Sequence, residues 1–84
     1  MLKAVENLIR DYNNGRKKAA YGNHSMEVHG EKVFYYYYIT AVCIYNSKTD
    51  KVEYHNGGWH SSSTTRTINS YKSYYGDAPV KDWK

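Results

Sequence analysis

The chain has 84 residues, enough for a single domain, and folding at this size buries only about 60–65% of the surface of the unfolded chain. Hydrophobic residues make up 40% and charged residues 24%, which excludes a disordered chain, and no apolar run approaches the roughly 20 residues of a membrane span. Twelve basic and eight acidic side chains give a net charge of +4, which excludes an acidic DNA mimic and favours a negatively charged partner. With one cysteine and no apolar leader, the sequence predicts a cytoplasmic protein.

Residues 1–14 predict an amphipathic helix that ends at Asn13-Asn14-Gly15. Its apolar positions recur at spacings of three and four, as on one helical face: Leu2, Val5, Leu8, Ile9 and Tyr12. A basic loop follows, formed by Arg16, Lys17 and Lys18, and continues into residues 19–23. These three cations are either solvated or in contact with phosphate.

Three strands are expected next, over residues 25–29, 32–45 and 51–55, because apolar and polar residues alternate or β-prone residues run together there. The middle strand is apolar on both faces, which is typical of a covered central strand. We expect the helices on its Ile39–Ala41–Cys43 face. Its tyrosines are either half-buried sheet residues, or Tyr36 and Tyr38 meet a partner. The Phe34–Tyr36–Tyr38 face would then be covered by that partner or by a second copy.

A last helix is expected from about residue 63 to 75, because Ser and Thr residues before it can cap its start and Gly76 can end it. Residues 77–84 are expected to form a tail, with Trp83 either docked or exposed. The sequence therefore predicts an α+β protein in the order α-β-β-β-α. A three-stranded antiparallel meander would pack against the N- and C-terminal helices in one domain, residues 1–76.

No residue pattern predicts catalysis or a cofactor. Cys43 lies between Val42 and Ile44 in a predicted strand, as a buried structural thiol does. The histidines pair at a spacing of five, which in a strand places them on opposite faces, so no metal site is expected. The serines at 61–63 beside His60 are better explained as helix caps than as part of a catalytic triad.

The most informative segment is residues 57–69, where two glycines and Trp59 precede a hydroxyl-rich helix start. A helix N-terminus can bind an anion, although an ordinary capped turn explains the same residues. We expect Trp59 to be buried against the sheet and the Asn69 amide to hold a nearby backbone group. Arg66 should then point outward towards a partner.

The same segment resembles a family of small uncharacterised bacteriophage proteins. The likeness covers roughly residues 21–75, including Tyr21-Gly22-Asn23 and the Tyr35–Tyr38 run. The matching positions around the helix start are Gly57, Gly58, Trp59, Thr64, Thr65, Arg66, Ile68 and Asn69. The resemblance implies a phage origin and expression in the cytoplasm of a bacterial host, and it implies no established activity.

Two functions compete. The first is a non-catalytic phage accessory protein that binds and inhibits or redirects a host machine, such as a defence complex containing nucleic acid. The alternative is direct nucleic-acid binding, with cations on phosphates and tyrosines stacked on bases. The candidate binding residues for either function are Arg16, Lys17, Lys18, Tyr36, Tyr38, His60, Ser63, Thr64, Arg66 and Lys72.

Overall fold

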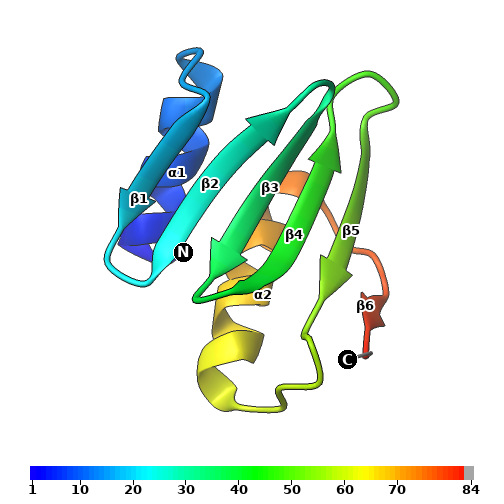
Figure 1. Ribbon diagram of the computed structural model, residues 1–84. Coiled ribbons are helices and arrows are strands. Elements are labelled where there is room, and N and C mark those ends of the chain that lie inside the picture. Colours follow the sequence, from blue (N-terminus) through cyan, green and yellow to red (C-terminus); the bar gives the residue numbers. More distant parts are fainter. Residues whose placement is uncertain (83–84) are drawn as a thin grey trace.

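The computed structural model describes residues 1–82 (Figure 1). Its elements are α1 (Lys3–Asn13), β1 (Lys18–Tyr21), β2 (His24–His29), β3 (Lys32–Tyr37), β4 (Thr40–Asn46), β5 (Lys51–His55), α2 (Ser62–Tyr75) and β6 (Val80–Lys81). The strands form one sheet in the order β1-β2-β3-β4-β5-β6, antiparallel except for the β5–β6 pair. The predicted α+β class with a helix before and after the main strands is confirmed. The three-stranded meander is wrong, because the sheet has six strands.

Both helices pack on one face of the sheet, and the opposite face carries neither of them (Figure 1). The predicted apolar stripe of α1 is confirmed at Val5, Leu8 and Ile9, which are buried in the core. The sheet and α2 contribute the remaining buried apolar side chains: Ala19, Met26, Val33, Tyr35, Val42, Cys43, Tyr54, Ile68 and Tyr71. No helix within residues 1–82 is long and apolar enough to cross a membrane.

The expected middle strand is two strands joined by a turn at Tyr38 and Ile39. Tyr37 pairs with Thr40 across the turn, and Tyr38 adopts a positive φ of 57° that reverses the chain. The predicted Ile39–Ala41–Cys43 helix-packing face is therefore wrong. Ile39 lies exposed in the turn, Ala41 pairs with Tyr36 on the open face, and only Cys43 enters the core.

A β-bulge changes the alternation in β4. Tyr35 pairs with Cys43 and Tyr36 pairs with Ala41, so Val42 has no opposite residue on β3. Val42 and Cys43 are both fully buried, although they are neighbours in the sequence. The sequence analysis assumed strict alternation of side chains along the strand, which would place these two residues on opposite faces of the sheet. Because of the bulge, both side chains are buried.

Two segments expected to be irregular join the sheet. The predicted basic loop ends at Lys18, which begins the edge strand β1 and pairs with Glu27 of β2. Residues 80–81, in the predicted tail, form β6 and pair with Tyr54 and His55 of β5. The prediction for Trp83 lies outside the described residues.

Candidate functional site

Three large apolar side chains gather at one end of the sheet. The β1–β2 turn, the β3–β4 turn, the loop after β5 and the start of α2 all lie at the end drawn lowest in Figure 1. Tyr38 and Ile39 of the β3–β4 turn are 62% and 92% exposed, and Trp59 of the following loop is 63% exposed. We call these three side chains the apolar tip. Apolar side chains clustered in one exposed place are typical of a contact surface.

Trp59 was expected to be buried, and this prediction is wrong. The Trp59 N–H donates to the carbonyl oxygen of Asn56 at 2.9 Å, which closes a tight turn through Gly57 and Gly58. Gly57 has a φ of +62°, and a Cβ there would lie 2.9 Å from Cγ2 of Thr40. The glycine thus brings the loop backbone against β4, and the Trp59 ring remains exposed to solvent.

Two hollows flank the apolar tip, and both are lined by Ile39, Thr40 and Trp59. The α2-side hollow, of about 500 Å³, extends past Tyr37 and Val42 to the start of α2. The open-face hollow, of about 550 Å³, extends over Tyr36, Ala41 and Ile44 to His55. The shared residues therefore form a ridge with an apolar depression on each side.

Three predicted site residues at the start of α2 have different surroundings. Ser61 caps the helix by accepting from the Thr64 N–H at 3.2 Å, and Thr64 is itself buried. Ser63 is exposed and lines the α2-side hollow. His60 contacts Asp82 at 3.2 Å, between Nε2 and Oδ2. Thr64 also lines the α2-side hollow, and its predicted binding role stays a prediction.

Arg66 points outward as expected. It is exposed and has no ion-pair partner among residues 1–82. Together with His60, Ser62 and Asn69 it lines a third hollow of about 620 Å³ along α2. Asn69 is exposed, and within residues 1–82 its amide side chain makes no hydrogen bond, so the predicted backbone contact is wrong.

The predicted basic residues do not form one patch. Arg16 contacts Asp11 at 3.6 Å, Lys18 contacts Glu27 at 3.6 Å, and Lys72 contacts Asp77 at 3.1 Å. Lys17 is exposed. The α1–β1 loop that carries Arg16 and Lys17 lies at the end of the sheet away from the apolar tip (Figure 1). The structure therefore separates Arg16, Lys17 and Lys18 from Arg66.

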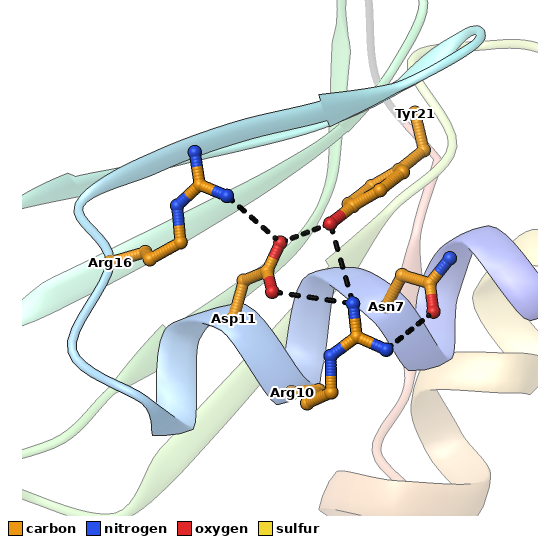
Figure 2. Close-up of polar contacts among 5 residues, drawn as sticks. All are labelled: Asn7, Arg10, Asp11, Arg16 and Tyr21. Carbon is orange, nitrogen blue, oxygen red and sulfur yellow. Dashed lines mark hydrogen bonds and ion pairs between the residues drawn. The ribbon is translucent and has the colours of Figure 1, made fainter.

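A cluster of polar contacts surrounds Asp11 (Figure 2). The Tyr21 hydroxyl donates to one carboxylate oxygen of Asp11, while Arg10 and Arg16 contact the carboxylate at 3.5 and 3.6 Å. The hydrogen bond from Tyr21 and the two guanidinium groups hold the pKa of Asp11 below its usual value, against the opposing effect of burial. Because the acceptor oxygens already have donors, this cluster acts as a clamp between α1 and β1.

The cysteine, histidine and serine side chains considered as reactive groups are not brought together within residues 1–82. Cys43 is fully buried as predicted, and burial raises the pKa of its thiol, which keeps it protonated and unreactive. Within residues 1–82, no group of three or more His, Cys, Asp and Glu side chains could hold a metal ion. The Ser61 hydroxyl contacts Thr64 at 3.0 Å, and no serine of the described chain hydrogen-bonds to His60.

The open face of the sheet is apolar at its centre. Phe34, Tyr36, Ala41 and Ile44 are each half-buried there, with the Phe34 and Tyr36 rings stacked at 6.5 Å between centroids. Tyr38 was expected on this face and instead lies in the β3–β4 turn. The expected second copy on the open face stays a prediction.

The sequence analysis included Tyr38 among the site residues and missed the exposure of Ile39 and Trp59 beside it. One available signal was strand length, since strands usually span about 3–10 residues and the expected run from Lys32 to Tyr45 is longer. Comparisons with known proteins add no further residue: no family model, curated protein or solved structure matches the chain. The phage resemblance therefore stays a prediction.

Proposed function

We propose that this protein is a non-catalytic phage accessory protein that binds a host macromolecular machine through the apolar tip and inhibits or redirects it. The observation that carries the proposal is the joint exposure of Tyr38, Ile39 and Trp59 at one end of a well-packed domain. Aromatic side chains in particular are enriched among the residues that dominate binding energy.

The backbone at Tyr38 supports the same proposal. A non-glycine residue with a φ of 57° is under strain of roughly 1–3 kcal/mol, and such strain concentrates at functional sites. Ile39 follows it with 92% of its surface exposed, so it adds almost nothing to the core. Glycine at 38 and a polar residue at 39 would suit the fold better, and a contact role explains the residues present.

The proposed setting is the cytoplasm of a bacterial host, which rests on the resemblance over residues 21–75. The proposed partner is a host protein or nucleoprotein complex, and a second copy on the open face is compatible with it. Neither a cofactor nor a substrate belongs to the proposal, because the apolar tip recognises by shape and apolar contact.

Direct nucleic-acid binding is a second candidate, favoured by the exposed rings of Tyr38 and Trp59 and by Arg66, which is exposed and has no ion-pair partner among residues 1–82. It is the weaker one, because Arg16, Lys18 and Lys72 lie elsewhere and already have acidic neighbours. Binding to single-stranded DNA that falls steeply with added salt would support this candidate.

Site-specific photo-crosslinking tests the proposal. A photoreactive amino acid replaces Ile39 in one sample and, as a matched control, Tyr74 in another, since Tyr74 is also an exposed apolar residue but lies on α2 near its C-terminal end. In host lysate treated with nuclease, position 39 should crosslink one host protein that position 74 does not. Equal crosslinking from both positions, or from neither, would contradict the proposal.

A further inference from the structure

The two hollows beside the apolar tip suggest which chemistry a partner must present. They meet along Ile39, Thr40 and Trp59, so one bound segment can occupy both. At about 500 and 550 Å³, each falls in the size range of small-molecule sites, roughly 300–1,000 Å³. A segment lying across the ridge would therefore place one bulky apolar side chain on each side.

The charged side chains of α2, the helix that borders the α2-side hollow, are both basic: Arg66 and Lys72. Among residues 1–82, no Asp, Glu, Lys or Arg side chain lines either hollow, and Arg66 lines the separate hollow along α2. The first turn of α2, which borders the α2-side hollow, also contains no acidic residue, so the positive end of its dipole is not neutralised from within the helix. Arg66 follows on the same helix, exposed and without an ionic partner among these residues, whereas the nearby Asp82 is engaged by His60.

We propose that the two hollows bind an acidic, amphipathic segment of the partner protein, with two bulky apolar side chains astride the Ile39–Trp59 ridge and a carboxylate beside Arg66. This inference rests on the proposed function and adds the chemistry of the partner. A protein segment fits better than a nucleic acid, because Arg66 is one cation and binding a nucleic-acid backbone would need several cations near its phosphates.

A random 12-residue peptide library selected on the full-length protein tests this inference. The selected peptides should carry net negative charge and two bulky apolar residues. Their affinity should fall at least about tenfold in Ile39→Asp and in Arg66→Glu, the change expected when an apolar contact or a charge pair is lost. Both positions are exposed, so both variants should fold, which circular dichroism checks. Lys48→Glu, at an exposed lysine of the β4–β5 turn, and Tyr74→Asp serve as matched controls and should leave the affinity within about twofold.

The inference would be overturned by selected peptides without acidic character, by affinity that Ile39→Asp leaves unchanged, or by selection of no peptide at all. Salt-sensitive binding of single-stranded DNA that Arg66→Glu abolishes, with no peptide selected, would assign the surface to nucleic acid instead. If position 39 still crosslinks a host protein while the selected peptides are basic or neutral, the acidic-segment inference fails and the proposed function stands. If both experiments fail, the proposed function fails with it.

Discussion

The backbone N–H of Tyr38 donates to the carbonyl oxygen of Asn23 at 2.8 Å, and the Asn23 amide donates to the Tyr38 hydroxyl at 3.0 Å. Asn23 lies in the β1–β2 turn and Tyr38 in the β3–β4 turn, so the pair joins two turns at one end of the sheet. The bonds hold the Tyr38 ring in a fixed place beside Ile39. The apolar tip is therefore a preformed surface, which lowers the entropy lost on binding.

Tyr38→Gly separates the fold from its proposed function. Glycine adopts a positive φ without strain, so the variant should unfold at an equal or higher urea concentration, with a gain of up to about 1 kcal/mol. The same variant should bind the crosslinked partner at least about tenfold more weakly, because the exposed ring is gone. A variant that binds normally, or that loses more than about 1 kcal/mol of stability, would contradict a contact role for Tyr38.

Leu8 and Trp59 should respond in opposite ways to alanine. Leu8 is fully buried in α1, so Leu8→Ala should cost about 2–5 kcal/mol in urea unfolding. Trp59 is 63% exposed, so Trp59→Ala should change stability by no more than about 0.5 kcal/mol while weakening partner binding. Trp59→Ala costing as much as Leu8→Ala would restore the structural role predicted from the sequence.

These two residues also show what the sequence could predict. The α1 stripe and α2 followed from apolar spacing and capping residues, because those signals are local, and Leu8 was correctly placed in the core. The Tyr38–Ile39 turn was missed because both residues favour strands and the backbone reverses without Gly, Asn or Pro. Trp59 was misplaced for a related reason, since the direction of its side chain depends on the contact of Gly57 with Thr40, which only the folded sheet creates.

Two buried tyrosines should behave differently when their hydroxyls are removed. Tyr54 donates to the carbonyl oxygen of Gly76 at 2.6 Å, so Tyr54→Phe should cost about 0.5–1.5 kcal/mol. The Tyr71 hydroxyl is buried and has no hydrogen-bond partner among residues 1–82, so Tyr71→Phe should be neutral or stabilising by up to about 1 kcal/mol. Parallel urea titrations check the difference, and an equal loss for both variants would show that the Tyr71 hydroxyl has a partner.

The ionisation of Asp11 should make the stability of the protein depend on pH in the acid range. Its pKa is lowered in the folded state, chiefly by the Tyr21 hydrogen bond, so the folded protein binds that proton less readily than the unfolded chain. Its stabilisation is present above the unfolded pKa of about 3.9 and is lost as the pH falls through the lower folded value. Asp11→Asn should therefore lower the melting temperature at pH 7 and flatten the decline below about pH 4.

Asp77 supplies the control for this measurement, because its side chain is exposed and its carboxylate pairs with Lys72 in contact with solvent. Asp77→Asn should leave the shape of the acid decline as in the parent protein. An Asp11→Asn protein with an acid decline as steep as the parent's would mean that the clamp between α1 and β1 does not depend on the charge of Asp11.

The most direct test of the account is the affinity of the crosslinked host partner for Ile39→Asp compared with Tyr74→Asp. Both residues are exposed, at 92% and 50%, so neither change should disturb the core. The account predicts a loss of at least about 2 kcal/mol, roughly 30-fold in affinity, for Ile39→Asp and less than about twofold for Tyr74→Asp. Equal affinities for the two variants, with both proteins folded, would contradict the claim that the apolar tip is the binding surface.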